Sequence, residues 1–166
     1  IAYLSHQLNQ GLQGVQISVG AVLGLLNVWL AYDMGAEIRN KRLGRAMALA
    51  MLASIGLLTA FMDSHYTTIL GLVFAQAFII LAIRFQRHQA IADAVGGGLM
   101  LGALVLSHPD TTIILMLGYV PWLVTMWFGQ PRPTLRTWLV LAIGMPLIAI
   151  IAIAPWLWSI KDLLGS

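Results

Sequence analysis

Residues 137–159 read TWLVLAIGMPLIAIIAIAPWLWS, a run of 23 positions without a charged residue. A helix rises about 1.5 Å per residue, so this run is long enough to cross the roughly 30 Å hydrocarbon core of a bilayer. A helix on the surface of a soluble protein would instead need a polar face. The run is therefore typical of a membrane-spanning helix.

The composition extends this interpretation to the whole chain. Of its 166 residues, 60% are hydrophobic and only 9% are charged, whereas a soluble domain carries roughly 25% charged residues. The apolar segments lack the strict alternation of barrel strands, which favours helices. We predict an all-α fold, a polytopic membrane helical bundle of about six transmembrane helices, formed by Val15–Tyr32, Arg45–Met62, Tyr66–Ile83, Ala90–Ser107, Thr111–Phe128 and Thr137–Ser159.

Residues 1–14 have a different pattern. Leu4, Leu8 and Leu12 recur at helical spacing, and polar residues rich in glutamine cover the other positions. This pattern predicts an interfacial amphipathic helix before a transmembrane bundle at 15–166. The chain begins with Ile1, and its glutamines do not suit a signal peptide, so we expect a fragment of a longer protein.

The basic residues indicate the orientation. Lys161 is predicted on one side of the membrane, and the other eight lie in the loops after the first, third and fifth segments. The positive-inside rule makes the basic side cytoplasmic, which predicts that both termini lie outside and that the membrane is the cell inner membrane. Because the basic residues lie in short clusters between apolar segments, they indicate membrane topology, and no nucleic-acid partner is predicted. These eight residues are Arg39, Lys41, Arg42, Arg45, Arg84, Arg87, Arg132 and Arg136.

Small and polar residues inside the segments predict contacts between helices. Gly20 with Gly24, and Gly98 with Gly102, are small residues four positions apart, which let helix backbones approach closely. We expect them to pack helices within the chain rather than to form a dimer. Asn27 is expected to form a hydrogen bond to a neighbouring helix.

Two short outer loops concentrate polar side chains: Asp63–Tyr66 and Ser107–Asp110. One interpretation is that these residues cap helix ends, since Asp and Ser are preferred there. The other is that the loops meet in a polar rim that binds an anionic head group. The candidate substrate-binding residues are Asp63, His65, Tyr66, Ser107, His108, Asp110 and Lys161.

Metal and cofactor chemistry have weaker support in the sequence. His65, His108 and nearby aspartates are metal-ligand types, but no spacing between them demands a metal, and none is predicted. The chain has no cysteine, which excludes a thiolate nucleophile and a disulfide framework. The sequence requires no cofactor.

Three stretches resemble the GT-C superfamily of multi-span glycosyltransferases, which use polyprenyl-phosphate sugar donors. They are LLNVWLAY at 25–32 with the basic turn after it, the glycine-rich AVGGGLMLGALVLSHP at 94–109, and Ala154-Pro155-Trp156. The resemblance implies transfer of a sugar from a lipid-phosphate donor at the outer face, with inversion. It also implies that His65, His108 and Lys161 bind phosphate, while Asp63 or Asp110 orients the sugar or the acceptor.

The chain departs from this superfamily in one important respect. The catalytic carboxylate of these enzymes normally lies in the first outer loop, after a spanning helix that this chain lacks. The catalytic residue is therefore unknown, and we expect the chain to be incomplete and inactive alone. The alternative is a non-catalytic, multi-span structural subunit of a larger respiratory or photosynthetic membrane complex, with lipids and other membrane subunits as partners. A transporter ranks third, because no chain of buried carboxylates is found.

Overall fold

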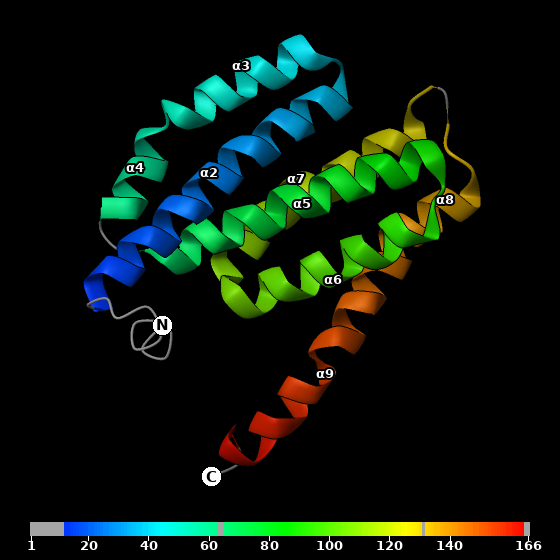
Figure 1. Cartoon of the computed structure of the whole chain (residues 1–166). Helices are drawn as coiled ribbons and strands as arrows, with labels where there is room; N and C mark the ends of the chain where they lie inside the picture. Colours follow the sequence, from blue (N-terminus) through cyan, green and yellow to red (C-terminus); the bar gives the residue numbers. More distant parts are fainter. Residues whose placement is uncertain (1–11, 63–64, 131, 165–166) are drawn as a thin grey trace. The chain divides into compact units, whose positions relative to one another are not determined.

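The computed structural model describes residues 12–62, 65–130 and 132–164 (Figure 1). These residues are almost entirely helical and contain no strand, which confirms the all-α class. The predicted interfacial helix falls largely outside the described residues. The helices are α2 (Leu12–Ile38), α3 (Lys41–Leu52), α4 (Ile55–Met62), α5 (Tyr66–His88), α6 (Ile91–Ser107), α7 (Pro109–Phe128), α8 (Leu135–Leu139), the π-helix η1 (Val140–Gly144) and α9 (Met145–Leu164).

Within the described residues, four helical stretches are long and apolar enough to cross a membrane: Gly14–Ile38, Tyr66–His88, Pro109–Phe128 and Leu135–Ser159. This result is compatible with an integral membrane protein. The predicted count of about six is not confirmed, because the other two segments are short or interrupted. Helix α6 has 17 residues, and the segment predicted at Arg45–Met62 is divided between α3 and α4.

Local hydrogen bonds stabilise the interruption between α3 and α4. The Ala53 N–H donates to the Leu49 carbonyl at 3.0 Å, and the Ser54 Oγ accepts from the Leu57 N–H at 3.3 Å. Serine is favoured at the position just before the first residue of a helix, because its side chain can accept a hydrogen bond from such an N–H. Ser54 therefore starts a new helix where the sequence pattern predicted a continuous one.

The chain divides into two compact units, with the boundary between Val73 and Phe74 inside α5. In the first unit, α2 and α3 form an antiparallel hairpin (Figure 1). A Cβ placed on Gly35 would lie 2.7 Å from the Gly44 Cα, and one on Gly44 would lie 2.5 Å from the Tyr32 carbonyl oxygen. Both distances are too short for a side chain, so the two helices touch backbone to backbone.

A buried amide joins α2 to α5 in the same unit. The Asn27 side chain is fully buried, and its Nδ2 donates to the Leu23 carbonyl at 2.9 Å and to the Ile69 carbonyl at 3.0 Å. The second bond crosses to α5 and confirms the predicted contact of Asn27 with a neighbouring helix. Burial of this amide without such partners would be costly.

The second unit is built around an aromatic contact between α5 and α7. The rings of Phe78 and Tyr119 meet edge to face, with centroids 4.9 Å apart. The Tyr119 hydroxyl donates to the Leu141 carbonyl of η1 at 2.9 Å. In η1 the Met145 N–H bonds five residues back, to Val140, so the next partner for Leu141 would be Pro146, which has no N–H. Tyr119 therefore replaces the hydrogen-bond donor that Pro146 lacks.

Helices α6 and α9 approach each other through glycine. A Cβ on Gly98 would lie 2.5 Å from the Ile148 Cβ, and one on Gly102 would lie 3.3 Å from the Ala149 carbonyl oxygen. This contact confirms the packing predicted within the chain for Gly98 and Gly102. Gly24 differs, because no described atom lies within 4 Å of a Cβ placed there, so the contact predicted for it is not seen.

We expect Gly98→Ala to lower the free energy of unfolding by about 1–3 kcal/mol, because the new methyl group overpacks the contact with Ile148. Gly118→Ala is the matched control, since a Cβ at Gly118 meets open space, and alanine is favoured over glycine in a helix by about 1 kcal/mol. Unfolding in SDS, followed by circular dichroism, measures both effects. Equal midpoints for the two variants would contradict this account.

Candidate functional site

The turn between α6 and α7 places His108 at the start of α7. The His108 Nδ1 accepts from the Thr111 N–H at 3.2 Å and lies 2.9 Å from the Thr111 Oγ1. Pro109 follows at the first helical position, where its missing N–H costs nothing. His108 therefore caps α7. Because Nδ1 accepts, a neutral ring carries its proton on Nε2, which is then a donor.

The other two polar residues of this turn differ in their exposure. The Ser107 Oγ donates back to the Leu104 carbonyl at 3.1 Å, and its side chain is half-buried. Asp110 is exposed in the first turn of α7, where the positive end of the helix dipole favours a carboxylate. The turn thus presents an exposed acid beside a half-buried imidazole.

An apolar groove begins at this turn and continues along α7. Its volume is about 600 Å³. From Pro109 to Pro121 it follows α7 for roughly 18 Å, at the helical rise of 1.5 Å per residue. Thr112 is the one polar residue in a lining formed by Val105, Pro109, Thr112, Ile113, Met116, Leu117, Val120 and Pro121. The groove therefore offers a long apolar surface with polar groups at one end.

The opposite end of the second unit is basic. The Thr137 Oγ1 donates to the Gln89 Oε1 at 3.0 Å, which joins the start of α8 to the turn after α5. Four basic residues of this unit lie near these two elements: Arg84, Arg87, Arg132 and Arg136. Helix α6 separates them from the Ser107–Asp110 turn, so the two ends of the unit differ in charge.

Gln89 is a structural residue that the sequence pattern did not indicate. Its φ of 58° lies in the left-handed region, where glycine is usual after the end of a helix. Its Nε2 donates to the carbonyls of Phe85 at 3.3 Å and Gln86 at 3.2 Å. The Gln89 side chain therefore donates to carbonyl groups at the end of α5 and accepts a hydrogen bond from Thr137.

The remaining predicted site residues are placed only in part. His65 and Tyr66 belong to the first unit, where the His65 side chain is exposed and α5 begins at Tyr66. Asp63 lies outside the described residues, as does the side chain of Lys161. The meeting of the Asp63–Tyr66 and Ser107–Asp110 loops therefore stays a prediction.

The described side chains include no group of three or more His, Asp or Glu residues that could hold a metal ion. Neither a family model, nor a curated protein, nor a solved structure matches the chain.

We expect His108→Ala to lower the free energy of unfolding by about 1 kcal/mol, because the Thr111 N–H loses its acceptor. His108→Asn should restore most of this loss, since asparagine is a strong capping residue. The midpoint of unfolding in SDS measures both variants. A capping role for His108 is contradicted if alanine leaves the midpoint unchanged or if asparagine lowers it as much as alanine does.

Proposed function

We propose that this chain is the membrane core of a GT-C-like glycosyltransferase, which moves a sugar from a lipid-phosphate donor at the outer face of the cell inner membrane. The observation that carries this proposal is the apolar groove that begins at the Ser107–Asp110 turn. A lipid-phosphate has an apolar chain and a polar head, so it needs this combination of surfaces. Residues 94–109, which carry the clearest resemblance to the superfamily, form most of α6 and the turn itself.

The residues at the turn suit different parts of such a donor. The isoprenoid chain would lie in the groove, where each buried CH₂ group contributes about 0.8 kcal/mol. The Nε2–H of His108 would donate to the phosphate. Asp110 has the same sign of charge as phosphate, so its carboxylate would accept from hydroxyl groups of the sugar or the acceptor. The catalytic base remains unassigned.

We also propose six membrane crossings with both termini outside. Helix α6 is about 25 Å long at 1.5 Å per residue, and its contacts with α9 run in the same order along both helices, from Gly97–Met145 to Gly102–Ala152. Helices α6 and α9 are therefore parallel, and α7, which lies between them in the sequence, runs in the opposite direction (Figure 1). If α5 and α7 both cross the membrane in the same direction, the chain must cross back between them, and α6 is the helix that connects them. Helices α3 and α4 would together form the second crossing.

Single-cysteine labelling tests this topology, because the chain has no native cysteine. In intact cells, an impermeant maleimide should label Asp110→Cys and should leave Lys41→Cys unlabelled until the cells are opened. Labelling of Lys41→Cys from outside would refute the orientation.

We expect the full chain in detergent to bind polyprenyl phosphate, and Val120→Trp to weaken this binding about tenfold or more, because an indole would fill the groove. Val124→Trp is the matched control, since Val124 is exposed on the same helix, one turn further along and outside the groove lining. Binding is measured by native mass spectrometry.

Two further measurements make this binding test decisive. A polyprenol without the phosphate should bind more weakly than polyprenyl phosphate, and His108→Ala should reduce that difference. If the wild-type chain does not bind polyprenyl phosphate, or if the two tryptophan variants lose equal affinity, the proposal is wrong.

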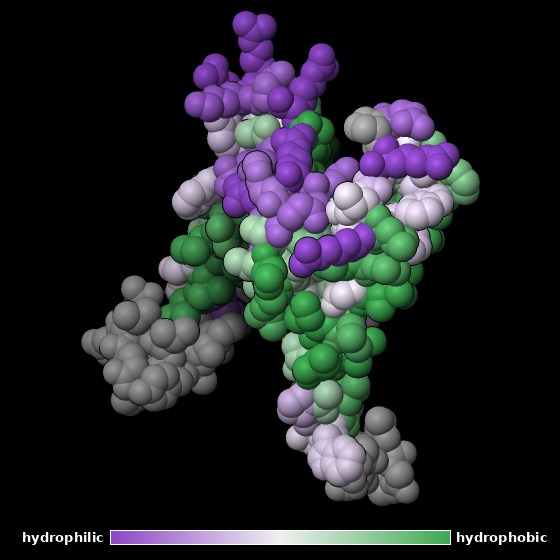
Figure 2. Space-filling model, turned by 90° about the vertical axis from the view of Figure 1, so that its right-hand side faces the viewer, coloured by the Kyte–Doolittle hydropathy of each residue, from purple (hydrophilic) through white to green (hydrophobic). Residues whose placement is uncertain are grey.

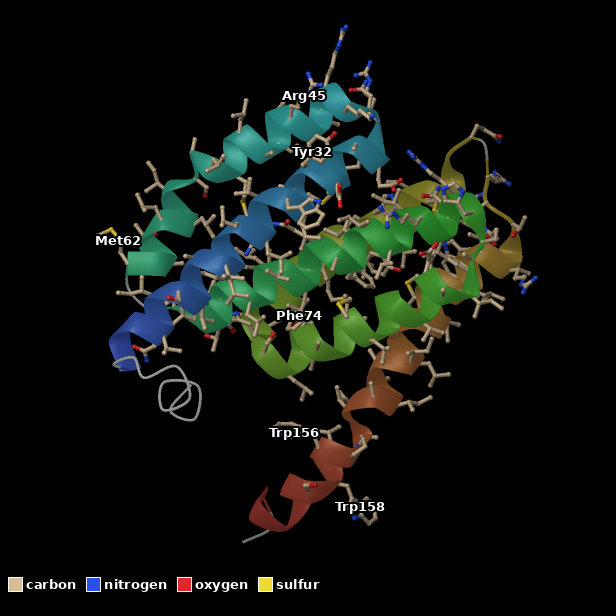
Figure 3. All side chains as sticks on the ribbon, viewed as in Figure 1. Tyr32, Arg45, Met62, Phe74, Trp156 and Trp158 are labelled. Atoms are coloured by element: carbon tan, nitrogen blue, oxygen red, sulfur yellow. The ribbon has the colours of Figure 1, made fainter. Side chains whose placement is uncertain are left out.

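A structural subunit is the second candidate, and α9 favours it. The part of α9 beyond its contact with α6 exposes large apolar side chains, including Trp156, Leu157 and Trp158. Figure 3 shows the two tryptophans on this part of α9, and Figure 2 shows that the surface of α9 is green near the rest of the second unit and paler toward its C-terminal end. A helix that is apolar all round must be covered by lipid or by other helices. A chain that binds no polyprenyl phosphate but purifies from native membranes in a fixed ratio with another membrane protein would support this alternative.

A further inference from the structure

The turn between α2 and α3 concentrates positive charge. Four basic residues occur within seven positions, and all four side chains are exposed: Arg39, Lys41, Arg42 and Arg45. We call this group the basic turn. The acids nearest in sequence on α2 are Asp33 and Glu37, and both are half-buried. The exposed charge of the turn is therefore positive.

The basic turn brings like charges together at an unfavourable position. Lys41 and Arg45 are four residues apart on α3, and Arg42 and Arg45 are three apart, so each pair shares one helix face and repels. The first turn of α3 contains no acid, although the positive end of the helix dipole favours an anion there. A bound anion would offset the repulsion among the basic side chains and their repulsion from the positive end of the helix dipole.

The backbone at the start of α3 does not need this anion. The Asn40 Oδ1 accepts from the N–H groups of Arg42 and Leu43, both at 3.0 Å. The groups that can bind an anion are therefore the basic side chains. Guanidinium groups match the geometry of phosphate oxygens especially well.

The hairpin holds these side chains beside an exposed apolar surface. The contact of Gly44 with the Tyr32 carbonyl fixes α3 against α2, and Figure 3 shows Arg45 and Tyr32 on facing turns of these helices. Exposed apolar side chains lie close to the turn, including Leu49 on α3 and Trp29 and Ile38 on α2. Leu49 lies about 6 Å from Arg45 along α3, at 1.5 Å per residue. The charges therefore lie just beyond an apolar band.

We propose that the basic turn is a binding surface for the anionic head groups of membrane phospholipids. Positive charge near a membrane surface is attracted to anionic lipids, with each Lys or Arg contributing roughly fivefold in affinity. The proposal rests on the proposed membrane location but not on sugar transfer. A chain that binds no polyprenyl phosphate could still bind anionic phospholipid at this turn.

The test uses the full chain in detergent with equal amounts of phosphatidylglycerol and phosphatidylcholine, and native mass spectrometry counts the lipids retained. The wild type should prefer phosphatidylglycerol. Lys41→Gln with Arg45→Gln should reduce its retention about tenfold or more. The matched control, Arg132→Gln with Arg136→Gln, removes the same charge from two exposed residues of another loop and should reduce retention less than the pair in the basic turn does, because that loop has two basic residues rather than four.

A second pair, Arg39→Gln with Arg42→Gln, should weaken retention as the first pair does, which guards against misfolding of one variant. Circular dichroism verifies that all variants keep their helix content. The proposal is overturned if the wild type does not prefer phosphatidylglycerol, if the control pair loses as much as the pairs in the basic turn, or if inorganic phosphate at the same concentration displaces the lipid.

Discussion

A helix that is interrupted in an apolar environment leaves N–H and carbonyl groups that water cannot satisfy. The interruptions described in this chain are closed by side chains. Tyr119 donates to the Leu141 carbonyl, Ser54 accepts at the start of α4, and Gln89 donates at the end of α5. These bonds allow a chain with few charges to turn, break and change helix type without unpaired backbone groups at these points.

The need to pair backbone groups at helix ends also determines the position of His108 in the candidate site. His108 uses its Nδ1 to cap α7, and this contact sets the ring orientation. The capping and binding interpretations of His108 are therefore compatible, because they use different nitrogens of one imidazole. Under the proposed function, loss of the ring would lower both stability and lipid-phosphate binding, whereas asparagine would restore only the cap. The two roles can thus be separated by substitution.

The sequence predicted those features that depend on composition or on short spacing. The apolar runs predicted the all-α class, the Gly98 and Gly102 spacing predicted a close helix contact, and Asn27 predicted a hydrogen bond between helices. The break at Ser54 was missed, because the surrounding residues are as apolar as those of a continuous helix. The bond between Tyr119 and Leu141 joins positions 22 residues apart, and no local pattern indicates such a pair.

The groove was not predicted from the sequence either. Its position nevertheless depends on the glycines of α6. Gly97, Gly98 and Gly102 face α9, so α6 packs more extensively on α9 than on α7. Because α6 lies close to α9, part of α7 stays uncovered, and Leu117 and Val120 remain exposed there. The glycine-rich helix thus accounts for two features together: a tight contact on one side, and an open apolar groove on the other. The proposed binding of a lipid-phosphate therefore depends on the same glycines that bring α6 close to α9.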